Sequence, residues 1–532
     1  MGSGLAGVCP RPGMTPRSDA ANSRGRTLGR GFTRRGVLTA ATAAAVLPSG
    51  AFAAVLPMPS EARLPRWRGF NLLEKFISGT EKPFREQDFD IIARWGFDFV
   101  RLPLDYRIWT PQPGQYNELQ LKELDQAVEW AGARGIHVDL CLHRAPGYSV
   151  AGKIDALDLW AEGAAGDEAR RQFAAQWQML AERYRGIGAE RLSFNLVNEP
   201  PRMPGARYAA AVTPAVEAIR EVSPDRVIIA DGMLAANGLT PVPELDPLRL
   251  AQSLRAYFPP WLTLAPGLAD ARRGAAEWPP ANQLNAYLYG NQKKEWQHPL
   301  AIKVDLPQRT ELEIQVAAVS APTRLVIRAN GATVLDQRFD PANDPDTRRK
   351  VGQGGDIRAL YDRGYTAALP AGALMVTIEL AEGDWLTFSR LSLRPFAGRP
   401  ARDVVPHFAR WGEPQRGYVL NREGSLIPEG EQAPYDRADL YRDELAEWGQ
   451  SAESGHGVMI GEWGVSGRTP HGAMLAWMRD HLAVWKQHGL GWALWHLRGE
   501  TGPLDSDRPD ARYETFEGHR LDRAMLEELQ AG

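Results

Sequence analysis

The sequence contains very little cysteine. Among 532 residues there are only two, Cys9 and Cys141, and Cys9 lies in an N-terminal segment expected to be removed, so the mature chain has no intramolecular disulfide. Cys141 lies inside a predicted strand, where we expect a thiol packed as a small apolar side chain. No spacing of cysteine and histidine matches a structural zinc site. The sequence therefore predicts a fold without disulfides or a bound metal.

Excess charge and long apolar runs are also lacking. The formal net charge is −3, so nothing indicates a nucleic-acid partner. After the N-terminal segment, no stretch is long and apolar enough to cross a bilayer, and we expect no membrane partner. Aromatic residues, in contrast, are plentiful, with 17 Trp and 14 Tyr. Aromatic faces can stack on sugar rings, but tryptophan is also an ordinary core residue, so the indication of a carbohydrate ligand is weak.

The first 53 residues have the features of an export signal. Scattered basic residues lead to the twin arginine Arg34-Arg35, and an alanine-rich apolar stretch ends in Ala51-Phe52-Ala53. This pattern is typical of a twin-arginine signal, so we expect a periplasmic or secreted protein. The alternative is an uncleaved membrane anchor, but Pro48 and Gly50 interrupt a stretch that is already short for a membrane span.

Short apolar runs alternate with helical patterns through most of the remaining chain. Helical stripes, such as the apolar residues spaced by three and four over 121–131, separate these runs. Eight strands separated by helices predict an α/β fold, the (β/α)8 barrel, whose active site forms at the carboxyl ends of the strands. The eight runs that we interpret as buried strands are 69–73, 97–102, 136–142, 192–197, 227–230, 251–257, 458–461 and 491–495.

One segment interrupts this alternation. From Pro299 to about Pro395 the apolar residues recur with period two, between turns such as Asn330-Gly331, which predicts an antiparallel β-sandwich. Its role stays open between binding carbohydrate and packing against the barrel or walling its active site. The predicted organisation is therefore an export signal over 1–53, a barrel over 54–298 and 397–532, and an inserted sandwich over 299–396.

Two glutamates each close a buried apolar run. Glu199 lies in Asn198-Glu199-Pro200 after the fourth predicted strand, and Glu462 lies in Gly461-Glu462-Trp463-Gly464 at the seventh. A charged residue at the carboxyl end of a barrel strand faces the site above the barrel. Two carboxylates placed in this way can flank a glycosidic bond, one as acid/base and one as nucleophile. Either glutamate alone would more often be a solvated or salt-bridged surface group.

With these motifs the barrel resembles glycoside hydrolase family 5, a large family of retaining cellulases, mannanases and related enzymes. The likeness covers roughly residues 66–286 and 403–529 and leaves the sandwich out. It implies that Glu199 is the acid/base, with a pKa that is high in the free enzyme and falls once Glu462 loses its charge. It implies that Glu462 is the nucleophile, kept ionised by Arg101 at the end of the second strand.

The resemblance also implies a set of substrate-binding residues. Asn198 would bind the 2-hydroxyl of the sugar, the Tyr257 hydroxyl would steady the nucleophile, and Trp495 would form the stacking floor. Arg101, at the end of the second predicted strand, and His143, at the end of the third, complete the set of candidate substrate-binding residues. Arg144 and Tyr148 are further candidate contacts outside the general pattern.

Arg255 departs from the family pattern. It occupies the position where the family usually has the histidine of a His-x-Tyr motif, and a permanent cation there cannot shuttle a proton. We expect Arg255 at the mouth of the site, where it binds a substrate hydroxyl or carboxylate or pairs with Glu462. Such a placement would alter substrate preference and leave both carboxylates intact.

The expected function is that of a retaining glycosidase acting on a β-linked glucan, in the manner of an endo-β-1,4-glucanase. Alternatives are a β-mannanase, an exo-acting β-glucosidase or a non-catalytic glycan-binding protein. Retaining chemistry predicts carboxyl groups about 5–5.5 Å apart. Two carboxylates suffice for this reaction, so no cofactor is expected, and the expected partner is the carbohydrate substrate.

Overall fold

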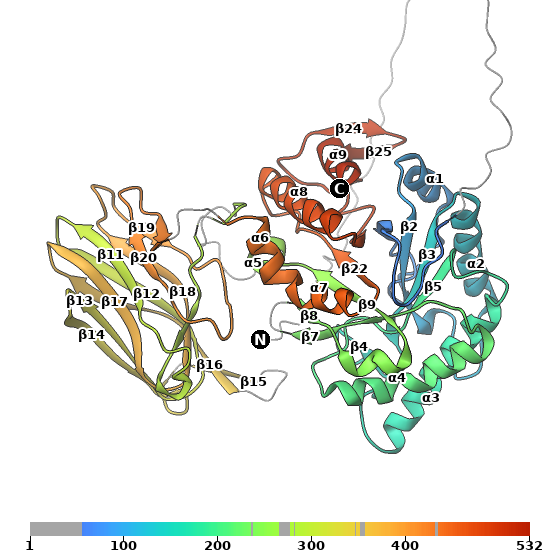
Figure 1. The fold of residues 1–532 in the computed structure, drawn as a ribbon, viewed down its shortest axis with the longest axis horizontal. Coiled ribbons are helices and arrows are strands. Elements are labelled where there is room, and N and C mark those ends of the chain that lie inside the picture. The colour runs from blue at the N-terminus through green and yellow to red at the C-terminus, as the bar shows by residue number, and fades with distance from the viewer. Residues whose placement is uncertain are drawn as a thin grey trace, which may run out of the picture.

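The computed structural model describes residues 56–235, 238–264, 277–280, 282–345, 347–351, 357–430 and 435–532. It consists of a barrel surrounded by helices and a separate β-sandwich, which Figure 1 shows side by side. The predicted export signal lies outside the described residues. Within the described ranges, no helix combines the length and the apolar character that crossing a membrane requires.

Eight parallel strands form the barrel, and pairing of the second with the third closes it. Each corresponds to one of the eight predicted runs, with ends that differ by a few residues, so the predicted barrel is confirmed. In spatial order from β2 around to β3, the strands are β2 (Phe99–Asp105), β1 (Arg68–Asn71), β23 (Gly491–Leu494), β22 (Val458–Trp463), β9 (Ala251–Ala256), β6 (Ile228–Asp231), β5 (Leu192–Asn195) and β3 (His137–Ala145).

Helices cover the outside of the barrel through one apolar face each. In α2 the buried residues recur at spacings of three and four, and the Asn117 side chain caps the helix by accepting from the Leu119 amide. The main helices are α1 (Glu86–Arg94), α2 (Glu118–Ala133), α3 (Ala164–Arg183), α4 (Gly205–Val222), α8 (His471–Gln487) and α9 (Arg523–Ala531). A composite helix consists of α6 (Arg437–Leu440), the π-helix η4 (Tyr441–Leu445) and α7 (Ala446–Glu453).

Short elements complete the barrel. The hairpin of β7 (Met233–Ala235) and β8 (Gly238–Thr240) follows β6, and β4 (Tyr148–Ser149) pairs with the end of β3. The remaining pieces of the barrel are η1 (Tyr106–Ile108), η2 (Pro243–Leu248), α5 (Pro260–Thr263), β24 (Tyr513–Phe516) and β25 (His519–Asp522), whereas η3 (Asn291–Lys293) belongs to the inserted sandwich.

Tryptophan belongs mainly to the core of the barrel. Eight of the 17 tryptophans are among the largest fully buried side chains of the described residues. Around β22, for example, Trp463 packs edge-on against Trp485 and Trp492. The abundance of tryptophan therefore reflects packing first and carries little information about a ligand.

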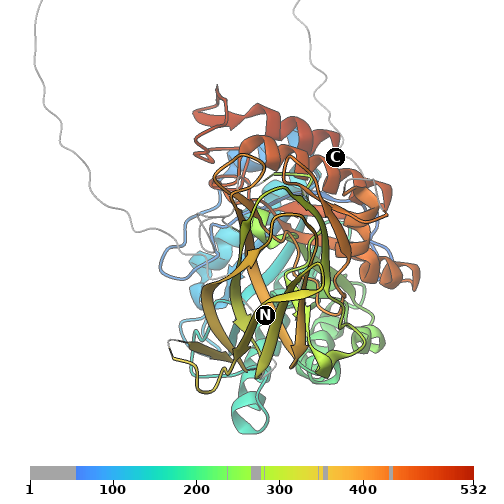
Figure 2. The same ribbon diagram turned by 90° about the vertical axis from the view of Figure 1, so that its left-hand side faces the viewer.

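The inserted domain is a sandwich of two sheets, which faces the viewer in Figure 2. In β11 buried and exposed residues alternate as the sequence predicted. One sheet has the order β10 (Tyr287–Tyr289), β18 (Trp385–Arg394), β12 (Thr310–Val319), β16 (Ile357–Leu369) and β15 (Arg348–Val351), with β19 (Arg402–Val404) also on β18. The other has the order β14 (Ala332–Phe339), β13 (Thr323–Ala329), β17 (Ala373–Glu382), β11 (Leu300–Leu306), β20 (Gly417–Leu420) and β21 (Leu426–Pro428).

The sheets of the sandwich extend beyond the predicted bounds of 299–396. Strand β10 precedes them, and β19, β20 and β21 follow them. The sequence pattern missed these strands because each has only three or four residues, and every residue of β10 is buried, which leaves no alternation to detect.

The segment between β19 and β20 contacts the barrel close to the end of β9. The His407 ring stacks on Trp261 of α5 with centroids 4.7 Å apart, and Phe408 stacks on Phe258 at 6.0 Å. Arg410 forms a buried ion pair with Asp443 of η4. The insertion is thereby joined to the barrel at the same end as the polar strand ends.

Candidate active site

Glu199 and Glu462 lie at the same end of the barrel, and both are buried, with 4% and 5% of their surface exposed. Glu462 belongs to β22, and Glu199 follows β5. The backbone of Glu199 adopts the left-handed conformation, with φ of 46°, which costs a residue with a Cβ about 1–2 kcal/mol. Its amide donates to Asp231 Oδ2 at 2.9 Å. Asp231 therefore helps to hold Glu199 in place.

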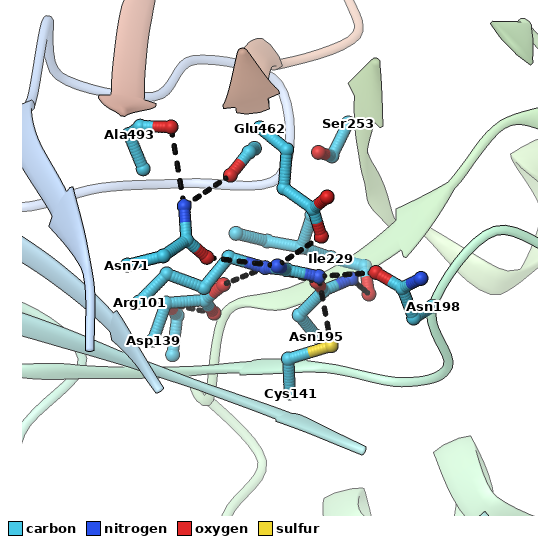
Figure 3. Close-up of polar contacts among 12 residues, drawn as sticks. Asn71, Arg101, Asp139, Cys141, Asn195, Asn198, Ile229, Ser253, Glu462 and Ala493 are labelled. Atoms are coloured by element: carbon cyan, nitrogen blue, oxygen red, sulfur yellow. Dashed lines mark hydrogen bonds and ion pairs between the residues drawn. The ribbon is translucent and has the colours of Figure 1, made fainter. Parts of the chain in front are cut away.

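Arg101 lies beneath the site at the centre of a buried network (Figure 3). Its guanidinium is fully buried and every nitrogen donates a hydrogen bond. One of these bonds is an ion pair with Glu462. The acceptors are Glu462 Oε1 (2.6 Å), Asn71 Oδ1 (2.9 Å), Asn198 Oδ1 (2.9 Å), Cys141 Sγ (2.9 Å) and Asn195 Oδ1 (3.0 Å).

Arg255 is buried in the floor of the site, with 3% of its surface exposed. The prediction that it lies at the mouth is wrong, because Arg255 and Ser253 share the face of β9 that points into the barrel, and Nη1 of Arg255 donates to Ser253 Oγ at 3.0 Å. Its Nη2 donates to Asn198 Oδ1 at 2.7 Å and to the Asp231 carboxylate. Arg255 therefore organises the polar residues from within the barrel.

The same guanidinium lies between the two glutamates. Arg255 Nε is 3.5 Å from Glu199 Oε1 and 3.4 Å from Glu462 Oε1. These two oxygens are consequently no farther apart than the sum of the two distances, about 7 Å, and this bound is compatible with the separation of about 5–5.5 Å that retaining chemistry needs.

Glu199, one of the two glutamates beside Arg255, is held in its protonated form. Burial, followed by the neighbouring charge of Glu462, raises the pKa of Glu199 to about 8, although Arg255 and Arg101 act in the opposite direction. At neutral pH the Glu199 side chain is therefore mostly a neutral acid that can donate a proton.

His143 lies beside Glu462 as a neutral ring. Its Nε2 is 3.7 Å from Glu462 Oε1. Burial and the charge of Arg101 lower the pKa of His143 well below its ordinary value, so the contact with Glu462 is not an ion pair at neutral pH.

Tyr257 and Trp495 line the part of the site that is less deeply buried. The Tyr257 hydroxyl lies 3.4 Å from Glu462 Oε2 and donates toward it. Trp495 is half-buried, and its ring packs edge-on against Phe76 with centroids 5.2 Å apart. Every site residue named from the sequence is thus gathered at one end of the barrel.

Comparisons with known proteins agree with this arrangement. Residues 59–259, which hold the first six barrel strands, match the family model described as Cellulase (glycosyl hydrolase family 5). Within these residues the barrel is similar to glycoside hydrolase family 5. The resemblance expected from the sequence is confirmed.

Relatives of this chain include Endoglucanase C of Acetivibrio thermocellus, 32% identical over 149 residues, which are 28% of this chain and 42% of the relative. A protein called Probable glucan 1,3-beta-glucosidase A from Aspergillus terreus is 33% identical over 159 residues, 28% of this chain and 37% of the relative. The chain thus spans about two-fifths of the length of these relatives. A solved structure titled as a glycoside hydrolase has the same fold, with a TM-score of 0.53 and 23% identity over 88% of this chain and 99% of that chain.

Two candidate contacts have structural surroundings instead. Arg144 is buried, donates to the Phe76 carbonyl at 2.6 Å and lies 4.3 Å above the Phe76 ring. Tyr148 is also buried, and its hydroxyl donates to the carbonyl of Glu199. Both side chains therefore support the backbone around the site.

Sequence reasoning missed three polar residues of the site, namely Asn71, Asn195 and Asp231. All three are buried at the carboxyl ends of the barrel strands β1, β5 and β6. Asn195 Nδ2 donates to Asp231 Oδ1 at 3.0 Å, which links the Arg101 network to Arg255. The signal that could have identified them is a polar residue closing an apolar run, the same signal that identified the glutamates.

Cys141 is buried as predicted, but its sulfur accepts a hydrogen bond from Arg101 and is not purely apolar in its contacts. It is a free, buried thiol in β3. Burial raises its pKa well above the ordinary value, so it remains a thiol in contact with Arg101.

Proposed function

We propose that the protein is a retaining β-glycosidase that hydrolyses a β-linked glucan. The observation that carries the proposal is the pair of buried carboxyl groups, one mostly protonated and one paired with Arg101, that face the same guanidinium nitrogen. Double displacement requires one protonated carboxyl group as the acid and a second carboxyl group as the nucleophile.

In the first step, Glu462 attacks the anomeric carbon. A bond forms between that carbon and a Glu462 oxygen, the glycosidic bond breaks, and Glu199 gives its proton to the departing oxygen. In the second step, Glu199, now a carboxylate, takes a proton from water as the water oxygen attacks the same carbon. The ester bond to Glu462 breaks, and both glutamates return to their starting states.

Asn198 is arranged to bind the sugar during both steps. Its Oδ1 accepts from Arg101 and from Arg255, which fixes the orientation of the amide. Its Nδ2 is buried without a hydrogen-bond acceptor among the described residues. A donor held in this way is suited to the 2-hydroxyl, whose hydrogen bond strengthens in the transition state.

The proposed substrate is a β-glucan, because the curated relatives are named as an endoglucanase and a glucan 1,3-beta-glucosidase. Endo-β-1,4-glucanase action remains our first expectation, with exo-acting β-glucosidase and β-mannanase activity as alternatives within the same chemistry. A non-catalytic glycan-binding protein is disfavoured, because a scaffold has no physical need for two buried carboxyl groups around shared guanidinium groups.

Mechanism-based labelling tests the proposal. The wild-type protein is incubated with activated aryl 2-deoxy-2-fluoro-β-glycosides of glucose, cellobiose and mannose, and the labelled peptide is located by mass spectrometry. We expect the label on Glu462, turnover of the matching aryl glycosides and β-glucans, and neither in Glu462→Ala. Labelling elsewhere, or hydrolysis by Glu462→Ala near the wild-type rate, would refute the assignment.

We also propose that the protein is exported by the twin-arginine route to the periplasm or beyond. The Arg34-Arg35 pair followed by an alanine-rich stretch supports this. Replacing both arginines by lysine should leave the full-length chain in the cytoplasm, as measured by fractionation. Unchanged export of that variant would exclude the route.

A further inference from the structure

Arg255 differs from Arg101 in how its guanidinium is used. All three nitrogens of Arg101 donate hydrogen bonds. In Arg255 the two terminal nitrogens donate to Asp231, Asn198, Ser253 Oγ and the Leu254 carbonyl. Its Nε, in contrast, is buried and has no hydrogen-bond acceptor among the described residues.

This remaining nitrogen is nearly equidistant from the two glutamates, 3.5 Å from Glu199 Oε1 and 3.4 Å from Glu462 Oε1. The terminal nitrogens hold the guanidinium in place, and Asp231 is both its ion-pair partner and the acceptor for the Glu199 amide. The Arg255 guanidinium is therefore held in a fixed position, and its Nε–H group is not hydrogen-bonded to either glutamate.

We propose that Arg255, anchored by Asp231, is a positioning residue that serves as a shared counter-ion, paired mainly with Glu462 in the free enzyme and with Glu199 in the covalent intermediate. The inference rests on the proposed retaining mechanism. When Glu462 becomes an ester it loses its charge, while Glu199 has just released its proton. A cation already placed between the two groups can stabilise the new carboxylate without moving.

The other charged and titratable groups around Glu199 come from every neighbouring strand. Arg101 (β2) favours the Glu199 carboxylate, and Asp231 (β6) and Glu462 (β22) disfavour it. The Tyr148 hydroxyl (β4) contacts the backbone of Glu199. His143 (β3) and Tyr257, after β9, face Glu462, and Cys141 and Asp139 lie deeper, beside Arg101. Among these groups only Arg255 lies within 4 Å of both glutamates as a permanent cation.

Arg255→Met should therefore shift the whole pH profile upward. The alkaline limb of kcat/KM, where Glu199 must be protonated, should move up because the cation no longer favours its ionised form. The acidic limb of kcat, measured with a dinitrophenyl glycoside so that hydrolysis of the intermediate limits the rate, should also move up. Each shift is expected to be at least about one pH unit, as for a charge this close.

Arg255→Lys tests the effect of the positive charge separately from the effect of the shape of the side chain. It keeps the cation, and we expect its limbs to lie closer to those of the wild type than to those of Arg255→Met, even if its rate is lower. Limbs of Arg255→Met at the wild-type positions would overturn the proposal, and so would equal shifts in the methionine and lysine variants. The matched control is Arg226→Met, which removes another buried arginine whose partners are backbone carbonyls at the opposite end of the barrel and should not move either limb.

Asp231→Asn provides a second test if Arg255→Met does not fold. The amide oxygen can still accept from the Glu199 backbone, but a negative charge that disfavours the Glu199 carboxylate is lost. The alkaline limb should then move downward, opposite to the shift in Arg255→Met. An upward shift or no shift would contradict the proposal.

Failure of this inference is distinguishable from failure of the proposed function. If the wild-type protein neither hydrolyses a β-glycoside nor becomes labelled on Glu462, the retaining mechanism itself is wrong. If the wild type is active and labelled while the limbs of the Arg255 and Asp231 variants stay in place, only the role of Arg255 is refuted.

Discussion

Replacing Glu199 by glutamine should stabilise the fold in a way that depends on pH. Burial and the charge of Glu462 raise the pKa of Glu199 from 4.5 to about 8. Below the unfolded-state pKa, both the folded and the unfolded chain hold the proton, and the residue adds no penalty. Between about pH 4.5 and 8, only the unfolded chain releases it, so the wild-type protein loses stability as the pH rises. Glutamine does not titrate, so the variant does not lose stability in this way as the pH rises.

The size of the effect follows from the pKa shift. Each pKa unit corresponds to about 1.4 kcal/mol, so the full shift sets an upper limit of roughly 5 kcal/mol, and we expect a gain of a few kcal/mol. The difference between Glu199→Gln and the wild type should be close to zero at pH 4 and level off above about pH 8. Loss of activity would accompany the gain in stability, as is common for buried active-site groups.

Urea unfolding followed by tryptophan fluorescence at a series of pH values between 4 and 9 measures this difference. The sandwich is unchanged in the variant, so a shift in midpoint reports on the barrel. Glu221→Gln, at an exposed position near the end of α4, is the matched control and should show no pH-dependent gain. A difference between Glu199→Gln and the wild type that is constant across the series would refute the conclusion that Glu199 is held as a neutral acid.

Three further outcomes are expected. The alkaline limb of kcat/KM in the wild type should lie near pH 8, because Glu199 must be protonated to act as acid and its pKa is about 8; a limb below pH 6 would contradict this. Trp495→Ala should raise KM about three- to tenfold through lost stacking on the sugar, with wild-type thermal stability as the control and an unchanged KM as the contrary result. Iodoacetamide should leave Cys141 unmodified in the native protein and label it in urea, because the thiol is buried and its pKa is raised; rapid native labelling would show that it is accessible.

The barrel was predictable because its strands are buried on both faces. Runs such as 192–197 and 458–461 are continuous apolar segments between turns, and their ends moved by only a few residues in the structure. The sandwich was predictable where strands such as β11 have one face on the core and the other in solvent. Its first and last strands were not, since three or four residues are too few to show a period.

Site residues were predictable where the residue type and its place at the end of an apolar run were enough to indicate a role. Glu199 and Glu462 stood out as charges at the ends of apolar runs. Arg255 could be located in the sequence, but its orientation could not, because whether a residue of β9 points into the barrel or outward depends on the register of the whole strand. Asp231 was missed for a related reason, since its importance comes from contacts with Arg255 and Glu199, which are distant in sequence.

The buried charges beneath the site explain why an arginine can occupy the histidine position. Arg101 and Arg255 are two permanent cations in a region closed to water, and they pair with Glu462 and Asp231. The two remaining acids tend to hold their protons, because burial raises the pKa of Asp139 to about 7 and, together with the charge of Glu462, that of Glu199 to about 8. Such a cluster approaches electrical balance, which limits the free energy lost by burying it. Glu199, the acid of the proposed mechanism, is the carboxyl group of this cluster at the reaction centre that has no close ion-pair partner of its own. Arg255 is near enough to stabilise the Glu199 carboxylate once Glu462 has become a neutral ester.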